Sequence, residues 1–539
     1  MRCRSVLALV AIALTPSAAR LDDNAAPSAV VHESVRRRLD ETGQVNIVVS
    51  VKGDELQNRV SSAVKQSRRR LKAATTPAAC ASDGHVPDED SATLAAGPSD
   101  ELVKHVVDQL KQHAESQHEE VLAFLQSNAS SSSGFNEREP SYSTAKSLWI
   151  SNEVVVRNVT AELVDQLSQL TSVAAIRTEA VGHIPITAIA NATASDLPGD
   201  LDSRRRLAQD LVAEWSVERV AALDAWRSGY FGNGTRVATI DSGVRGSHSS
   251  LSANFLGEYG WYDAIGTAAA PEDSSGHGTG VMGVLVGQDG LGVAPLAQWM
   301  ACRACDATND CQEGDLLECA QFLTCPTLST TTTEATTCAA RPHVINNSWT
   351  LDRGTTSFES VVAVWTAAGI VSVFAAGNTG PSCSTVGAPA DRDAGIAVGS
   401  TDYSNQMSSF SARGPGLDGN TKPDVVAPGE TIVSSGYDSD ASLKLFSGTS
   451  IAAPHVSGAV ALLMEAFPSL SVDEIRVLLR ETADAAVSIP STQTTSPCGG
   501  DTVSAGVLSV PNNVFGYGIV NVSAALSHQA SQGNATVNL

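Results

Sequence analysis

Four short motifs carry side chains that together could hydrolyse an acyl bond. Ser450 opens an apolar run in "SGTSIAAPHVSG", Asp241 ends the apolar "ATID", His277 stands in "GHGTG", and Asn378 follows "VFAAG". A serine hydroxyl becomes a nucleophile near neutral pH when a histidine takes its proton and a carboxylate orients that histidine. An asparagine amide can then donate to the oxygen on which negative charge develops. These residue types indicate acyl transfer through a serine.

Each motif also has an ordinary structural interpretation. Serine is a preferred helix N-cap, and Asp-Ser-Gly and Gly-Asn form turns. A histidine between glycines fits a loop, and one such motif alone would decide nothing. All four together, in the order aspartate, histidine, asparagine, serine, favour the chemical interpretation, provided that the fold brings them to one place.

The elements that must position them begin at about Leu207. Short, continuous apolar runs occur at residues 235–241, 343–348, 370–378 and 395–400, and they suit strands buried on both faces of a parallel sheet. Residues 358–369 and 471–484 have the spacing of amphipathic helices that would cover such a sheet. Because chemistry in open parallel sheets gathers at the carboxyl ends of strands, we expect Asp241, Ser348 and Asn378 at one edge.

The region from about Arg219 to Leu526 resembles the subtilisin-like serine peptidases, peptidase family S8. "ATIDSGV", "GHGTG" and "SGTSIAAPHVSGAVALL" look like the family's aspartate, histidine and serine motifs, with "VINNSW" and "VFAAGN" between them. "GVAPLAQWMACRAC" and "FGYGIVNVSAAL" look most like the bacillopeptidase F branch. The resemblance implies a three-layer α/β fold with a mainly parallel central sheet. It also implies a serine endopeptidase that acts on proteins, forms an acyl-enzyme and is made as a zymogen.

The same resemblance assigns roles to residues. Asp241 would orient His277, His277 would be the general base, Ser450 the nucleophile, and Asn378 an oxyanion donor together with the Ser450 backbone. An extended substrate would pair as an added strand with a set consisting of Ser348, Trp349, Thr350, Ala375, Ala376 and Gly377. A catalytically silent relative that binds proteins through this groove is the alternative, which loss of a triad member would favour; none is missing.

The sequence departs from the family pattern at three positions. Gly280 stands where a second histidine is usual, and we expect altered packing there rather than lost activity. Ile451 replaces the usual methionine after the nucleophile. Thr350 stands where a glycine is common, and we expect its side chain to narrow the pocket.

The first 206 residues form a separate N-terminal part. Residues 1–19, with Arg2, Arg4 and an apolar run, have the layout of a secretory signal peptide, so we expect an exported protein. Residues 20–206 read as an α+β propeptide, with an inhibitor-like module at about 146–182 by resemblance. Arg204–Arg206 is a candidate processing site, with a plain charged linker as the alternative. The string Arg-Arg-Arg-Leu occurs twice more, so the sequence does not identify which of the three is processed.

Composition limits partners and cofactors. The 539 residues carry a formal charge of −23, which disfavours nucleic acid and anionic membranes as partners, and we expect a monomer. Eight cysteines follow residue 300, six of them within an expected insertion at about 302–340, and export favours disulfides over zinc. The chemistry needs no cofactor. Structural calcium is common in the resembled family, but the sequence identifies no carboxylate set for it.

Overall fold

The computed structural model describes residues 29–53, 98–130, 142–185, 188–191, 213–329, 334–490, 498, 503–504 and 507–532. The predicted signal peptide, the helix expected from Asp54 and the Arg204–Arg206 cluster lie outside the described residues. We call residues 29–191 the N-terminal section and residues 213–532 the C-terminal section. No helix in the described ranges is both long and apolar enough to cross a membrane.

The N-terminal section is built on a five-stranded sheet in the order β1-β5-β2-β4-β3. Its strands are β1 (Val30–Val31), β2 (Gln44–Val51), β3 (Thr144–Leu148), β4 (Glu153–Thr160) and β5 (Val173–Thr178). The helices α1 (Glu33–Thr42) and α4 (Ala161–Leu167) connect them, and the Thr160 side chain caps α4 by accepting from Leu163 N. The predicted α+β character of this section agrees with these elements.

A seven-stranded, wholly parallel sheet forms the centre of the C-terminal section, in the order β17-β16-β15-β14-β8-β10-β9. Its strands are β8 (Arg236–Asp241), β9 (Trp261–Asp263), β10 (Gln298–Arg303), β14 (Val344–Asn347), β15 (Val371–Ala375), β16 (Ile396–Thr401) and β17 (Val425–Pro428). All four predicted apolar runs are strands of this sheet. The predicted α/β fold with a parallel sheet is therefore confirmed.

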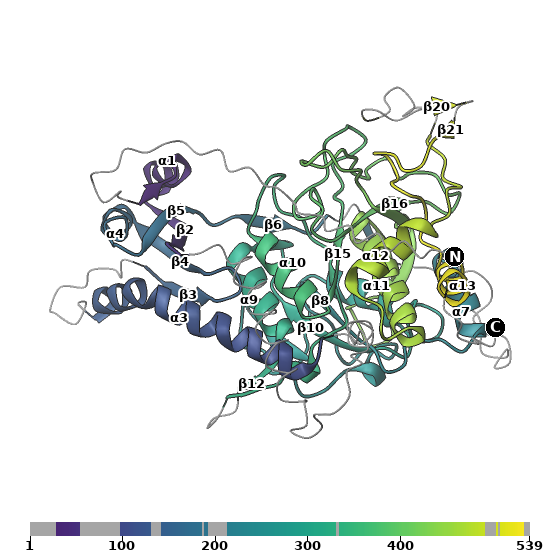
Figure 1. Ribbon diagram of the computed structural model, residues 1–539, viewed down its shortest axis with the longest axis horizontal. Coiled ribbons are helices and arrows are strands. Elements are labelled where there is room, and N and C mark those ends of the chain that lie inside the picture. The colour runs from purple at the N-terminus through teal and green to yellow at the C-terminus, as the bar shows by residue number, and fades with distance from the viewer. Residues whose placement is uncertain are drawn as a thin grey trace, which may run out of the picture.

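Helices cover both faces of this sheet and make three layers (Figure 1). Side chains alternate along each strand: Ala238 and Ile240 of β8 face one apolar core, and Val237 faces the other. The first core lies under α9 (Glu313–Thr324) and α10 (Phe358–Ala367). The second lies under α7 (Ala222–Arg227), α8 (His277–Val286), α11 (Thr449–Ala466), α12 (Val472–Glu481) and α13 (Val522–Gln532).

Smaller elements complete the C-terminal section. They are α6 (Trp215–Arg219), β11 (Asp310–Gln312), β12 (Thr327–Ser329), β13 (Glu334–Thr336), β18 (Ile432–Ser435), β19 (Leu443–Ser447), β20 (Val503–Ser504), β21 (Val507–Leu508) and the 3₁₀ turns η1 (Ser252–Asn254) and η2 (Cys338–Ala340). In the N-terminal section, β6 (Val181–His183) and β7 (Ala188–Asn191) follow β5.

Residues 302–340 differ from the expected insertion. This stretch contains the end of the central strand β10 and the covering helix α9, so most of it belongs to the layered core. Within it, β12 and β13 pair antiparallel. The cysteines form disulfides, as expected, and their pairing is Cys302–Cys319, Cys305–Cys311, Cys325–Cys338 and Cys383–Cys498.

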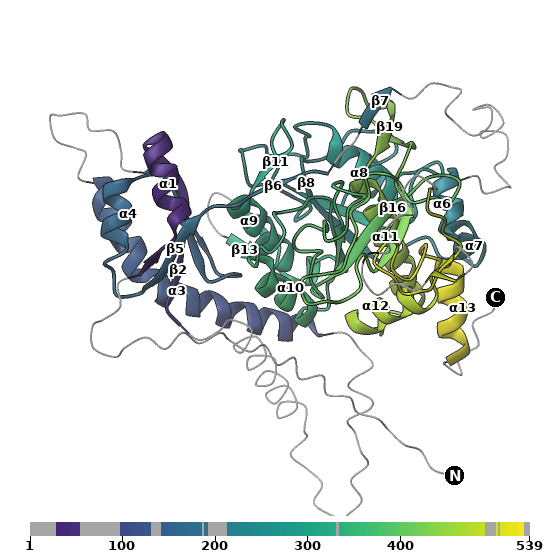
Figure 2. The same cartoon turned by 90° about the horizontal axis from the view of Figure 1, so that it is seen from above.

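The long helix α3 (Asp100–Ser130) lies along both sections (Figure 2). Its residues Val103, Val106 and Leu110 are buried in the same apolar core as Leu323 and Trp365 of the C-terminal section. At its start, Arg341 pairs with Asp100 and donates to Pro98 O. The helix therefore joins the two sections through apolar packing along its length and through the contacts of Arg341 at its start.

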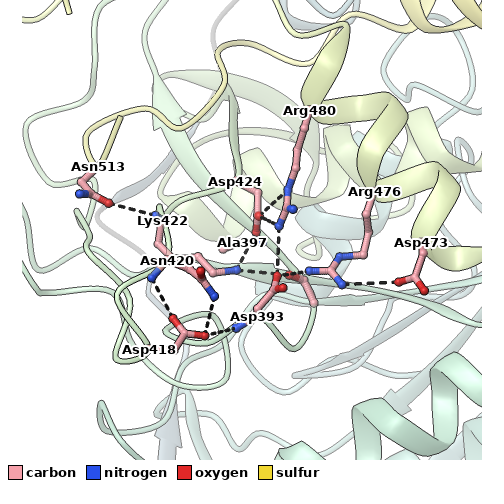
Figure 3. A network of polar contacts seen from close by, with 11 residues as sticks. Asp393, Ala397, Asp418, Asn420, Lys422, Asp424, Asp473, Arg476, Arg480 and Asn513 are labelled. Atoms are coloured by element: carbon pink, nitrogen blue, oxygen red, sulfur yellow. Dashed lines mark hydrogen bonds and ion pairs between the residues drawn. The ribbon is translucent and has the colours of Figure 1, made fainter. Parts of the chain in front are cut away.

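A buried charge network anchors α12 on the sheet (Figure 3). Asp424, which precedes β17, accepts from Lys422 Nζ at 2.9 Å, from Arg480 Nε at 2.9 Å and from Ala397 N at 2.7 Å. Burial alone would raise the pKa of Asp424, but the two cations outweigh it and hold that pKa below its ordinary value. Asp393 extends the network to Arg476 and Arg480.

Candidate active site

The aspartate and the histidine of the predicted triad are in direct contact. Asp241 ends β8, and His277 is the first residue of α8; both side chains are fully buried. His277 Nδ1 lies 2.7 Å from Asp241 Oδ1, which also accepts from Ser242 N at 2.8 Å. Because a carboxylate only accepts, Nδ1 carries the hydrogen, and Nε2 of the neutral ring has a free lone pair. Within the described residues, Nε2 makes no hydrogen bond.

The serine and the asparagine meet at one carbonyl oxygen of the N-terminal section. Ser450, the second residue of α11, donates from Oγ to Pro185 O at 3.1 Å. Asn378 Nδ2 donates to the same oxygen at 2.5 Å. The helix α11 packs against α8, which begins with His277. The structure thus brings Ser450 and Asn378 to one carbonyl oxygen, and it pairs His277 with Asp241 at the start of the neighbouring helix α8.

Two neighbours missing from the predicted catalytic set hold this geometry. Thr449 fixes the asparagine amide, since its N and its Oγ1 both donate to Asn378 Oδ1 at 2.9 Å, which points Nδ2 toward Pro185 O. Ser348 Oγ donates to Ser450 O at 2.6 Å and ties the end of β14 to α11. The Gly-Thr-Ser triplet was the available signal for Thr449.

Two glycines leave room that a side chain would fill. A Cβ at Gly448 would lie 2.5 Å from Pro185 O and 2.8 Å from Ser450 Oγ, so only glycine admits a carbonyl there. A Cβ at Gly280 would lie 2.4 Å from the Phe446 ring. This contact gives a physical reason for the glycine at a position where the resembled family has a second histidine.

Residues before Pro185 lie as an added strand between β11 and Thr350, the two edges that we call the groove. His183 N donates to Thr350 O at 2.8 Å, and Thr350 N donates back to His183 O at 2.9 Å. On the other side, β6 pairs antiparallel with β11, and Ile184 N donates to Asn309 O at 3.1 Å. The segment is thus held between two edges, of which only the Thr350 edge was predicted.

The described chain resumes at Ala188 with the strand β7. The strand β7 pairs antiparallel with β19, which leads directly into Gly448 and α11 (Figure 2). We call the described residues 181–185 and 188–191 the arm. Its backbone is paired both before Pro185 and in β7, as in an extended peptide that adds to a sheet.

The other predicted substrate-binding residues have different surroundings. Trp349 is buried and its ring packs against Phe358 and Phe374. Ala376 N donates to Val398 O, and Gly377 N donates to Thr449 Oγ1. Ala375 is a buried residue of β15. Within the described residues, Thr350 is the member of this set whose backbone pairs with the arm.

A further histidine lies within the helix that carries Ser450. His455 is fully buried, and its Nδ1 donates to Ile451 O at 3.0 Å. Burial lowers the pKa of His455 to about 4, with the hydrogen bond to Ile451 opposing this only in part. This ring is neutral at physiological pH and packs as a core residue.

The described residues contain no group of three or more histidine, cysteine, aspartate or glutamate side chains that could hold a metal ion.

Comparison with known proteins agrees with this geometry. Residues 232–518 match the model of the subtilase family. Bacillopeptidase F of Bacillus subtilis strain 168 is 35% identical over 345 residues, which cover 58% of this chain and 22% of that protein. Subtilisin E of the same strain is 33% identical over 276 residues, 50% of this chain and 65% of that protein. Subtilisin of Bacillus pumilus is 32% identical over 276 residues, which cover 50% of this chain and 90% of that protein.

The chain thus spans about a fifth of bacillopeptidase F and 65% of subtilisin E. The family match covers more than half of the chain and includes Asp241, His277, Asn378 and Ser450. The motifs, the parallel sheet and these matches lead to one conclusion: the chain belongs to the subtilase family of serine peptidases.

Proposed function

We propose that this protein is an exported serine endopeptidase that is made as an inhibited precursor and cleaves its own chain first. The observation that carries the proposal is the position of Pro185 O, which accepts from both Asn378 Nδ2 and Ser450 Oγ. Export is supported by the layout of residues 1–19.

The geometry supports the following steps. Ser450 Oγ attacks the carbonyl carbon of the bound peptide while His277 Nε2 takes its proton; Asp241 at Nδ1 holds the ring and stabilises its charged form. Asn378 Nδ2 donates to the oxyanion. The tetrahedral intermediate collapses as the histidine gives the proton to the leaving amine, and an acyl-enzyme on Ser450 remains. Water, deprotonated by the same histidine, then releases the acid and restores the serine.

The arm is the first substrate under this proposal. Because Pro185 O accepts from Ser450 Oγ and Asn378 Nδ2, the bond cut under this proposal is the one after Pro185, upstream of the predicted site at Arg204–Arg206. A cut at the arginine cluster would then be a later trimming step and stays a prediction. Until it leaves, the arm excludes other peptides because it occupies the groove on both sides of Ser450.

A second contact supports the inhibitory role of the N-terminal section. On what we call the docking face, Lys146 of β3, Arg157 of β4 and Arg177 of β5 meet carboxylates of α9. Arg177 donates to both oxygens of Glu313, at 2.7 and 2.8 Å. Lys146 lies 2.7 Å and Arg157 3.1 Å from Asp315. Glu313 and Asp315 are 0% and 2% exposed, so the N-terminal section desolvates these charges and pairs them.

The test compares the full chain with its Ser450→Ala variant, each incubated with casein. We expect the wild type to separate at Pro185–Ile186, seen as a new N-terminus at Ile186, and then to degrade casein. The variant should do neither. Ser457→Ala is the matched control, because Ser457 is also a buried serine of α11 but bonds Asn346 instead of the arm.

Two outcomes would contradict the proposal. If Ser450→Ala still degrades casein, the nucleophile lies elsewhere. If the wild type loses its N-terminal section and leaves casein intact, the catalytically silent relative is the better description. Cleavage at Arg204–Arg206 in both proteins would assign that step to another peptidase.

A further inference from the structure

A contact between a histidine and an aspartate links the arm to the groove near Pro185. His183, two residues before Pro185, lies directly opposite Asp310 in the β6–β11 register. Its Nδ1 is 2.7 Å from Asp310 Oδ1, and the two side chains are 63% and 44% exposed. Opposed residues of antiparallel strands present their side chains on the same face, so this pair follows from the strand register.

The groove holds Asp310 in place through its own loop. The Cys305–Cys311 disulfide closes a short loop that contains this residue. Within the loop, Asp306 Oδ1 accepts from Asp310 N at 3.1 Å and from Thr308 N at 2.8 Å. The disulfide and these hydrogen bonds therefore fix the backbone that carries the Asp310 carboxylate.

The neighbouring arm residues make different contacts. Ile184 is 6% exposed and packs in an apolar core, so its position takes an apolar side chain. A Cβ at Gly182 would lie 3.3 Å from Leu316 Cδ1, Leu351 Cδ2 and Thr350 O, so its position favours a small residue. Among these three positions, only that of His183 faces a carboxylate.

We propose that Asp310 is a specificity-determining residue that selects substrates with a cationic side chain at the third position before the cleaved bond. The inference rests on the proposed peptidase function. A substrate that enters as an added strand in the register of the arm places its third residue opposite Asp310. The substrate class is then unfolded protein with lysine, arginine or histidine at that position, followed by an apolar residue.

The effect is modest because the pair is exposed. Solvent-exposed ion pairs contribute little, which corresponds to about a two- to fivefold preference for a cation over a neutral side chain. The preference should shrink as salt screens the pair.

The experiment digests a reduced, alkylated mixture of casein and serum albumin with the matured enzyme and maps every cleavage site by mass spectrometry. Wild type should show about two- to fivefold enrichment of lysine, arginine and histidine at the third position before the cut. Asp310→Asn should remove this enrichment, and Asp310→Lys should replace it with enrichment of aspartate and glutamate. Asp224→Asn is the control, since Asp224 is also an exposed, paired aspartate but lies on α7.

The outcomes separate the two proposals. Absence of any cleavage by wild type defeats the peptidase function itself. Cleavage without enrichment, or with the same enrichment in wild type and Asp310→Asn, overturns the role of Asp310 and leaves the peptidase function standing.

Discussion

The docking face and the arm hold the N-terminal section by different physical means. The docking face uses side chains: cations on three strands meet buried carboxylates of α9. The arm uses backbone: its described residues pair with Thr350, β11 and β19, and the contact of His183 with Asp310 is exposed. The docking face therefore depends on the charges of particular side chains, whereas the arm is held mainly by backbone hydrogen bonds, which do not depend on the identity of the side chain.

This difference bears on the order of events after cleavage. Cutting the Pro185–Ile186 bond breaks the arm in two but leaves the docking face intact. Under this proposal the N-terminal section inhibits through two contacts. Cleavage breaks the contact made by the arm, whereas the contact at the docking face is lost only when the N-terminal section dissociates. Variants that affect only one of the two contacts can separate these steps.

The largest expected effect concerns chemistry at the arm. Asn378→Ala removes the Nδ2 donor to Pro185 O, so we expect turnover on casein and cleavage of the arm to fall about 10²–10³-fold. Docking should be unchanged. Initial rates on casein at saturating concentration, with the N-terminal section followed on gels, measure both. Equal rates for wild type and variant would show that another group stabilises the oxyanion.

A smaller effect is expected at the docking face. Arg177→Met leaves Glu313 buried without its bidentate partner, so the cleaved N-terminal section should dissociate about thirtyfold more readily, or about 2 kcal/mol. Cleavage at Pro185–Ile186 should continue. Size-exclusion chromatography of the cleaved protein, together with the time at which casein cleavage begins, measures the change.

Arg36→Met provides the control for this prediction. Arg36 pairs with Asp165 far from α9, and both side chains are more than half exposed, so its loss should not affect retention. If Arg177→Met and Arg36→Met retain the N-terminal section equally, the buried pairs do not determine its affinity.

The smallest expected effect is on stability. It involves neither the arm nor the docking face but His455, in the helix α11 that carries Ser450. The folded-state pKa of His455, about 4, lies below its ordinary value, so the unfolded chain takes up the proton first as pH falls. The free energy of unfolding should therefore drop from about pH 6.5 toward pH 4, by at most about 1–2 kcal/mol between pH 7 and 5.

His455→Gln, made in the Ser450→Ala background to prevent self-digestion, should flatten this dependence. Urea unfolding at pH 7 and pH 5 measures it. An unchanged slope would assign acid sensitivity to other groups, such as His343, whose pKa burial also lowers to about 4.

The sequence predicted the elements whose pattern is local. The apolar runs that became β8, β14, β15 and β16 are buried on both faces, and such runs are visible in a single sequence. The strand β10 was missed because it ends in Cys302 and Arg303. Cys302 is buried in the core, but the cysteine pattern assigned it to an insertion. Cysteine spacing reports neither burial nor sheet membership.

The residues of the proposed triad could be named because each lies in a recognisable motif. The arm could not, because Val181–His183 and Pro185 carry no local signal; only the fold brings them between Thr350 and β11. Asp310 was not predicted as a site residue for the same reason. Its partner His183 is 127 residues away in the chain, and only strand pairing juxtaposes them.

Under the proposed maturation, the contacts of the helix α3 predict how the release of the N-terminal section depends on temperature. Val103, Val106 and Leu110 share a core with residues of the C-terminal section, so departure of the N-terminal section transfers this strip from a dry contact into water. Exposure of apolar surface raises heat capacity. The enthalpy of release must therefore increase with temperature, and the equilibrium between retained and departed N-terminal section is a curved, rather than linear, function of temperature.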